Sequence, residues 1–408
     1  MKRSKKILLI VLIICVILIG LFMYGFVRYL SQNLHTAATS GPAWIVKLAI
    51  IGGADVNERR SKGLLSYSEP TPLLLAAEYN SDEKVIEALI EAGADARDYY
   101  ESGYMTALHL AARSNPNPKV VETLIRNGAE IDARDHSELY RGATALHYAV
   151  VSNNIEVISA LINAGAGVNK TDGHENTALM FAASEREDVQ ITKLLLEAKA
   201  DTEVKNSWDE TALSLAAKHN QNVQIVSTLI AAGAEFSCNL LYYAADNPNP
   251  EVFKTIYESG NCKDQVHQFL SDALFNCVSN NDSDPPDTLA LILSLGADVN
   301  ARDNNRYRNM TPLMYAAENN DNPTVLSMLI EAGSDVNAQD YYGRTALMHA
   351  AVHPNPLSDF KIQLMTILLD AGADVSLKTT DGKTALDYAR ENIYRIEEHP
   401  IFLQLQVH

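Results

Sequence analysis

The chain has 408 residues, of which 47% are hydrophobic and 7% aromatic, and its formal net charge is −18. Residues 1–30 hold five basic and no acidic residues, which leaves 28 basic and 51 acidic residues, a net charge of −23, for the rest. Such a surface repels phosphate backbones, so no nucleic-acid partner is expected. The negative charge fits two interpretations, solubility alone or attraction of a basic partner.

An apolar segment near the N-terminus predicts a membrane helix. Residues 7–27 contain no charged residue, and about 20 helical residues cross a hydrocarbon core about 30 Å thick. A cleaved signal peptide has a shorter apolar region of roughly 7–15 residues, so we expect an uncleaved signal anchor behind a basic flank at 1–6. Four basic residues precede the segment and only Arg28 follows it. This predicts a single-pass membrane protein with a cytoplasmic N-terminus and a periplasmic or exoplasmic remainder.

The rest of the chain repeats one short signature, which reads TALHLAA at residues 106–112. Copies begin at Thr71, Thr106, Thr144, Thr177, Thr211, Asn239, Asp272, Thr311, Thr345 and Thr384, with a further worn copy over residues 32–57. The steps between copies are 28 to 39 residues. A period of about 33 residues around a T-P-L-H-x-A core is typical of ankyrin repeats, and by these residues the chain resembles the ankyrin-repeat family.

The resemblance covers about nine tenths of the chain and implies an all-α fold. We expect an ankyrin-repeat solenoid of about ten to eleven helix-turn-helix repeats with short hairpin loops over residues 32–396, preceded by one transmembrane helix. A C-terminal tail at 397–408 would follow it. Each initial Thr is predicted to cap the first helix of its repeat. Glycine ends most second helices in a left-handed conformation, whereas one repeat has Lys199 at that position.

One region departs from the period, and we expect an irregular stack over residues 235–290. The step from Thr211 to Asn239 is only 28 residues, which is too short for the usual hairpin. Cys277 replaces an alanine of the signature and is predicted to be a buried thiol. Cys238 and Cys262 lie in nearby loops of one worn repeat; they could be free or, in an oxidising compartment, paired.

The sequence contains no recognisable catalytic or metal-binding motif. The four cysteines lack C-x-x-C spacing and accompanying histidines. His109 and His147 belong to the repeat signature, where backbone hydrogen bonds between repeats explain them. We therefore expect no enzyme activity, no cofactor, no metal and no small-molecule substrate. An enzyme site hidden in residues 235–290 is the alternative from another functional class, although that region lacks paired catalytic groups.

The resemblance implies that the surface binds another protein, through hairpin tips and the exposed face of the first helices. Aromatic side chains dominate protein-binding hot spots, and they recur in the predicted hairpins. The candidate partner-binding residues are Tyr99, Tyr100, Tyr104, Tyr140, Trp208, Tyr307, Tyr341 and Tyr342. The sequence thus predicts a membrane-anchored, non-catalytic scaffold or recruiter. An antagonist that occludes one protein partner, a spacer, and tip residues that only pack on the next hairpin remain alternatives.

Overall fold

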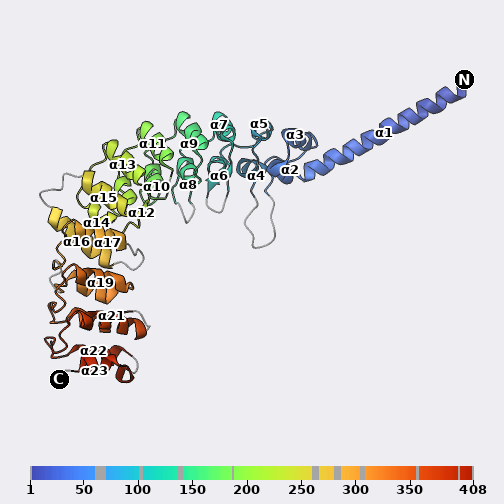
Figure 1. Cartoon of the computed structure of the whole chain (residues 1–408). Coiled ribbons are helices and arrows are strands. Elements are labelled where there is room, and N and C mark those ends of the chain that lie inside the picture. Colours follow the sequence, from blue (N-terminus) through green and yellow to red (C-terminus); the bar gives the residue numbers. More distant parts are fainter. Residues whose placement is uncertain are drawn as a thin grey trace. The chain divides into compact units, whose positions relative to one another are not determined.

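In a computed structural model of the chain, the described residues are 2–59, 70–100, 104–136, 141–185, 188–259, 266–279, 286–303, 308–354, 358–393 and 396–406. These residues form short helices joined by tight turns and hairpins, with very little strand (Figure 1). The chain falls into two compact units, residues 1–212 and 213–408. The prediction of an all-α repeat fold is confirmed.

The first unit begins with one long helix and continues with pairs of short helices. Its helices are α1 (Lys2–Gln32), α2 (Leu34–Ser40), α3 (Ala43–Ile51), α4 (Pro72–Tyr79), α5 (Glu83–Glu91), α6 (Ala107–Ser114), α7 (Pro118–Arg126), α8 (Ala145–Val151), α9 (Ile155–Asn163), α10 (Ala178–Glu185) and α11 (Val189–Glu197). Strands β1 (Tyr99–Tyr100) and β2 (Met105–Thr106) pair antiparallel, with Tyr99 opposite Thr106.

Each helix of a pair packs on the equivalent helix of the next pair, so the first unit has two layers. The first helices α2, α4, α6, α8 and α10 form one layer, and the second helices α3, α5, α7, α9 and α11 form the other. Buried alanines such as Ala111 and Ala112 let the first helices approach closely. In α7 an apolar stripe faces inward, with Val120 and Leu124 fully buried.

The second unit repeats the same two-layer arrangement. Its elements are α12 (Ala212–His219), α13 (Val223–Ala231), α14 (Leu240–Ala244), α15 (Pro250–Ser259), α16 (Val266–Ser279), α17 (Pro286–Ser294), α18 (Pro312–Asn319), α19 (Pro323–Glu331), α20 (Ala346–Ala351), α21 (Ser358–Asp370), α22 (Ala385–Asn392), the 3₁₀ helix η1 (Ile396–Glu398) and α23 (Ile401–Leu405). α14, α16, α18, α20 and α22 pack in series, as do α13, α15, α17, α19 and α21.

Two features of the second unit differ from regular repeats. Residues 397–408 were predicted to be a C-terminal tail, but they include the end of η1 and the helix α23. Helix α23 packs on α21 and α22, because its apolar residues Ile401 and Leu405 become buried there. The irregular region contains a five-residue α14 and a 14-residue α16. Cys277 is a buried thiol outside any disulfide, as predicted, and Cys238 is disulfide-bonded. Cys262, named with Cys238 above, lies outside the described residues.

In the described part of the chain, the turns that follow the second helices have a left-handed residue, as predicted. Gly93, Gly128 and Gly333 have φ values of 99°, 95° and 96°, and Lys199 takes the same conformation with φ 66°. Glycine adopts this conformation without steric penalty, whereas a side chain with a Cβ atom is strained there. The sequence therefore located a site of backbone strain.

Replacing Lys199 by glycine is expected to stabilise the chain by about 1 kcal/mol, because the strain at positive φ disappears. The increase should appear in the free energy of unfolding measured with denaturant. Gly165→Lys is the matched reverse change, since Gly165 has φ 93° in the preceding repeat, and it should destabilise by a similar amount. A lower stability of Lys199→Gly would contradict the assigned role of this position.

Initial threonines such as Thr106 and Thr144 stand at helix N-caps, and in these two repeats a histidine side chain joins the cap. The backbone N–H of Thr144 donates to Nδ1 of His147 at 3.1 Å, and Nε2 of His147 donates to the carbonyl of Asn176 at 3.2 Å. His109 makes the same contacts with Thr106 and with the carbonyls of Ala133 and Ala143. The predicted backbone bonding between repeats is confirmed. Thr71 differs, because its hydroxyl donates to Asp98 at 2.7 Å.

The capping histidines should make the stability of the first unit sensitive to pH. Burial lowers the pKa of the His147 imidazole from 6.5 to about 4. The unfolded chain therefore binds a proton near pH 6.5, and the folded chain binds it only near pH 4. Between these values acid favours the unfolded state, so the stability contribution of His147 is complete above pH 6.5. Up to about 3 kcal/mol is lost as the pH falls to 4.

Denaturant unfolding between pH 7 and 4 tests this expectation. His147→Gln should lower stability at pH 7 by about 1 kcal/mol and should reduce the loss on acidification. His136→Gln is the control, since His136 is exposed on a hairpin. An unchanged pH profile in His147→Gln would show that His147 does not carry the effect.

Buried asparagines link the first helices of consecutive repeats. The side-chain amide of Asn115 donates to the carbonyls of Ala77 and Asn80 at 3.0 and 2.9 Å, and its oxygen accepts from the backbone N–H of Asn117 at 3.0 Å. Asparagines at the equivalent position repeat the amide contacts with the preceding repeat; they are Asn80, Asn247 and Asn320. This role was not predicted from the sequence.

Candidate protein-binding surface

Five of the six described candidate tip residues are exposed on the hairpins that precede the first helices. The exposed fractions are 41% for Tyr99, 50% for Tyr104, 60% for Trp208, 65% for Tyr341 and 43% for Tyr342. Tyr100 is half-buried. Tyr140 and Tyr307 lie outside the described residues.

Two aromatic clusters lie in the first unit, and each includes a histidine from a neighbouring hairpin. Tyr99 stacks on Tyr104 with a 5.1 Å centroid separation, and the edge of His136 contacts Tyr104 at 5.2 Å. Trp208 stacks on His174 at 5.2 Å. The packing alternative is therefore partly correct, because these rings contact neighbours while keeping an exposed face. The histidines were missed, since their partners belong to other hairpins.

The backbone at Tyr104 is strained. Its φ is 54°, at a position two residues before the helix-capping Thr106. Gly142, Gly343 and Gly382 occupy the same position in other hairpins, also with positive φ. A tyrosine costs more there than glycine would, so the ring is held at the tip despite a backbone penalty.

A third aromatic cluster lies in the second unit. The rings of Tyr341 and Tyr342 meet edge to face at 5.4 Å, and the guanidinium of Arg344 lies 5.3 Å from the centre of the Tyr342 ring. An aromatic ring beside a guanidinium combines apolar area with a positive charge, which suits a protein interface.

Backbone hydrogen bonds join consecutive hairpins and fix the tips. Within the first unit, the N–H of Ser207 donates to the carbonyl of His174 at 2.9 Å. Within the second unit, the N–H of Tyr341 donates to Arg308 and the N–H of Thr380 donates to Tyr342, both at 2.9 Å. The tip side chains consequently project from a backbone that is already ordered, which reduces the entropy lost on binding.

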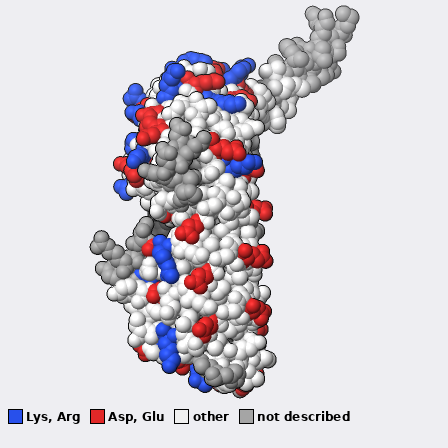
Figure 2. Space-filling view, turned by 60° about the vertical axis from the view of Figure 1, so that its left-hand side comes forward, with Lys and Arg blue, Asp and Glu red and all other residues white. Residues whose placement is uncertain are grey.

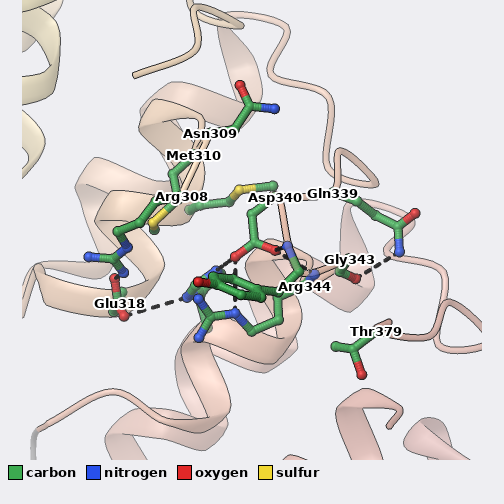
Figure 3. A network of polar contacts seen from close by, with 12 residues as sticks. Arg308, Asn309, Met310, Glu318, Gln339, Asp340, Gly343, Arg344 and Thr379 are labelled. Atoms are coloured by element: carbon green, nitrogen blue, oxygen red, sulfur yellow. Dashed lines mark hydrogen bonds and ion pairs between the residues drawn. The ribbon is translucent and has the colours of Figure 1, made fainter. Parts of the chain in front are cut away.

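A buried polar network supports the tip of Tyr341 and Tyr342, and Asp340 is at its centre (Figure 3). The carboxylate accepts from the backbone N–H groups of Tyr342 and Arg344, both at 2.8 Å, and from Nε of Arg344 at 3.0 Å. It also accepts from Nε2 of the buried His349 at 3.1 Å. Four donors therefore converge on one side chain.

The network extends from the hairpin to the first helices. Nδ1 of His349 lies 3.7 Å from Glu318 on α18, and Glu318 pairs with Arg308 of the preceding hairpin (Figure 3). Burial alone would raise the pKa of Glu318, but hydrogen bonding and charge from His349 and Arg308 lower it from 4.5 to about 2. Burial also opposes ionisation of Asp340, yet the bonds from His349 and Arg344 hold its pKa below the usual value. Both carboxylates are thus ionised at neutral pH.

Acidic side chains dominate part of the surface. Red side chains recur down the lower part of the face in Figure 2, where blue side chains form only a few groups. Among the described residues no group of three or more His, Cys, Asp and Glu side chains could hold a metal ion. The candidate surface therefore consists of exposed aromatic rings on ordered hairpins, supported at Tyr341 and Tyr342 by a buried charge network.

Helix α1 carries the apolar N-terminal segment. Residues Ile14–Gln32 have a mean hydropathy of 1.9, and 6% of the residues in the apolar stretch are buried. Its C-terminal end packs on α3, and Leu30 is buried. By length and composition this helix meets the requirements of a transmembrane span, which a signal sequence also meets.

The chain is a stack of two-helix repeats with hairpins, buried alanines and Thr-His caps. These features define a helical repeat protein. A family model described as "Ankyrin repeats (3 copies)" matches residues 34–135, 136–206, 179–267 and 274–378. The chain belongs to the ankyrin-repeat family. Members of this family typically act as non-catalytic scaffolds for protein–protein interaction. A search of curated proteins gave no match.

Proposed function

We propose that this chain is a membrane-anchored, non-catalytic ankyrin-repeat protein that holds a protein partner against its hairpin tips. The single observation that supports this role is the recurrence of exposed aromatic side chains on ordered hairpins, at Tyr99, Tyr104, Trp208, Tyr341 and Tyr342. Such rings bury large apolar areas on binding and lose little side-chain entropy.

Membrane anchorage through residues 7–27 is part of the proposal. Apolar side chains of α1 are exposed, for example Val16 at 64%, Leu18 at 59% and Phe22 at 72%. A hydrocarbon environment would cover these side chains, whereas water would leave them exposed at a free-energy cost. The repeats begin at α2, directly after α1, so they would lie close to the bilayer. We propose that they lie on the periplasmic or exoplasmic side, with the N-terminus in the cytoplasm.

Site-specific photo-crosslinking in cells tests the binding surface. A photoreactive phenylalanine derivative would replace Trp208 or, as the control, Trp44. These residues are 60% and 58% exposed, but Trp44 lies on the second helix α3 and not on a hairpin. We expect a discrete crosslinked protein from position 208 and from Tyr341, and none from position 44. Identical products from both tryptophan positions, or none from the hairpins, would contradict the proposal.

The contribution of a tip ring can then be measured with the crosslinked protein as the ligand. Trp208→Ala should weaken its affinity at least tenfold, as expected when a hot-spot aromatic residue is removed. Trp44→Ala should leave the affinity unchanged. Equal melting temperatures of the two variants would separate lost binding from lost stability.

Protease accessibility tests the membrane topology. The repeats should be digested when protease reaches the periplasmic or exoplasmic side of intact membranes. A control protease site placed before residue 7 should remain protected. Digestion of the N-terminal site and protection of the repeats would reverse the proposed orientation, and release of the whole chain from membranes by alkaline carbonate would exclude a spanning helix.

A further inference from the structure

A hollow of about 860 Å³ lies within the second unit, between the first helices α14, α16 and α18. Its walls include Tyr242 and Tyr243 of α14, Asp272 and Phe275 of α16, and Tyr315 of α18. This volume lies within the range of sites that hold small ligands or inserted side chains. The proposed tip surface does not use it.

The irregular repeats create the hollow. α13 ends at Ala231 and α14 begins at Leu240, so little chain is left for a hairpin before α14. α16 begins six residues before Asp272, the position where a first helix is normally capped, and is 14 residues long. The face of α16 that contains Phe269 and Asp272 consequently forms a wall beside the short α14.

Two pairs of aromatic rings give the hollow apolar faces. Tyr242 and Tyr243 meet edge to face at 5.8 Å, and Phe275 and Tyr315 do so at 5.5 Å. Tyr242 is 44% exposed, so its ring is accessible. The faces of aromatic rings carry negative electrostatic potential and attract cations.

The charged groups that line the hollow favour a cation. Three carboxylates, Asp272, Asp298 and Asp303, line it together with one guanidinium, that of Arg302. Arg302 donates to the carbonyls of Asn309 and Gln339 at 2.9 and 2.8 Å, so its guanidinium already has hydrogen-bond acceptors. Burial, followed by the charges of neighbouring groups that include Asp246 and Asp272, raises the pKa of Tyr242, as expected in a negative potential.

We propose that this hollow binds an arginine or lysine side chain from an extended basic segment of the protein partner. The cation would lie against the exposed Tyr242 ring and near Asp272, because the guanidinium of Arg308 already lies 5.6 Å from the centre of the Tyr315 ring. The flanking residues of the segment would follow the first helices. The inference rests on the proposed function, in which the repeats bind a protein, and adds a second contact with a defined chemistry. It also gives the net charge of −23 outside residues 1–30 a role in selecting the partner.

Peptides with matched central residues test the proposal. The probes are nine-residue peptides with varied uncharged neighbours and a central arginine, lysine or citrulline, the last being a neutral analogue of arginine. Fluorescence anisotropy with the full chain in non-ionic detergent would measure affinity at two salt concentrations. We expect at least one arginine or lysine peptide to bind tenfold or more tightly than its citrulline counterpart, with weaker binding at high salt.

Variants locate the bound peptide. Asp272→Asn and Tyr242→Ala should each weaken binding about tenfold. Glu251→Gln is the matched control, because it removes the same charge from the second helix α15, outside the hollow. Melting temperatures would confirm that all three variants fold. If either hollow variant fails to fold, crosslinking locates the bound peptide instead. A photoreactive group at position 268 should crosslink to the peptide, and free peptide should compete for that crosslink.

Equal affinity for arginine and citrulline peptides, or equal effects of Asp272→Asn and Glu251→Gln, would overturn the inference. Absence of binding by every cationic peptide would overturn it too. In each case a protein crosslinked at Trp208 or Tyr341 would leave the proposed tip function intact. Conversely, if the peptide binds in the hollow but the hairpins give no crosslinked protein, only the proposed tip surface is contradicted.

Discussion

Replacing Asn115 by alanine is expected to lower the free energy of unfolding by about 3–4 kcal/mol, although it removes no apolar contact of the core. The asparagine is 1% exposed, and its side chain pairs with two carbonyls of the preceding repeat and with the N–H of Asn117. Alanine would leave these three backbone groups without that partner, at about 1–3 kcal/mol for each that stays dry. Water that enters the site would satisfy some of these groups, so the total loss of stability should stay near the lower end of this range.

The loss should also change the cooperativity of unfolding. In a repeat protein, stability depends on the interfaces between neighbouring repeats, and Asn115 connects α6 to the preceding first helix, α4. We expect denaturation of Asn115→Ala to separate into two transitions, with hydrogen exchange accelerated on both sides of this interface.

Asn117→Ala is the matched control. Asn117 caps α7 and donates to the carbonyl of Ser81 at 2.7 Å, but it is only half-buried. Its loss should cost about 1 kcal/mol, a typical value for an N-cap. Similar losses for the two variants would show that Asn115 has no special linking role.

The sequence predicted those parts of the fold that a repeating pattern specifies. Thr106 marked a helix start, Gly128 marked a helix end, and Lys199 marked the repeat with a strained turn; the structure agrees at all three positions. Capping and left-handed turns depend on local chemistry, so one repeat suffices to recognise them.

Apart from the backbone bonds of His109 and His147, the contacts between repeats were not predicted, because they join residues about 35 positions apart. No role in linking repeats was predicted for Asn80 or Asn115, although asparagine recurs nine residues after Thr71, Thr106, Thr211 and Thr311. The histidines beneath Tyr104 and Trp208 were missed for the same reason. Asp340 was missed although its partners Tyr342, Arg344 and His349 lie close to it in the sequence. Residue spacing shows which positions recur but not which carbonyl each side chain reaches.

The hollow in the second unit shows a different limit. The short step before Asn239 predicted irregularity over residues 235–290, yet it did not predict a cavity. The hollow depends on the extension of α16 and on the neighbouring rings of Phe275 and Tyr315. These are properties of three packed helices, and no single segment specifies them.

The second large effect is expected at Asp340. Asp340→Ala should lower the free energy of unfolding of the second unit by about 3 kcal/mol or more, because four hydrogen-bond donors lose one buried acceptor. His349 is fully buried and Arg344 is mostly buried, so neither side chain regains complete hydration. Since the pKa of Asp340 lies below its usual value, its contribution is present at neutral pH and is lost on acidification through that pKa.

Asp340→Asn separates the hydrogen-bonding part of this stability contribution from the part that depends on the negative charge. The amide oxygen can still accept from the backbone N–H groups of Tyr342 and Arg344, but the charge that attracts His349 and Arg344 is gone. We expect it to lose about half as much stability as alanine does. Asp335→Ala is the control from the same repeat, since Asp335 is exposed and accepts from its own turn at Asn337, and it should cost about 1 kcal/mol or less.

Loss of Asp340 should also impair the tip before the unit unfolds. The carboxylate fixes the backbone N–H groups on both sides of Gly343, so its removal frees the turn that presents Tyr341 and Tyr342. Crosslinking from position 341 should therefore fall in Asp340→Ala under conditions where circular dichroism shows a folded chain, while Asp335→Ala retains it. If crosslinking persists in Asp340→Ala, the network stabilises the fold without positioning the tip, and the binding surface must be ordered by the hairpin backbone bonds alone.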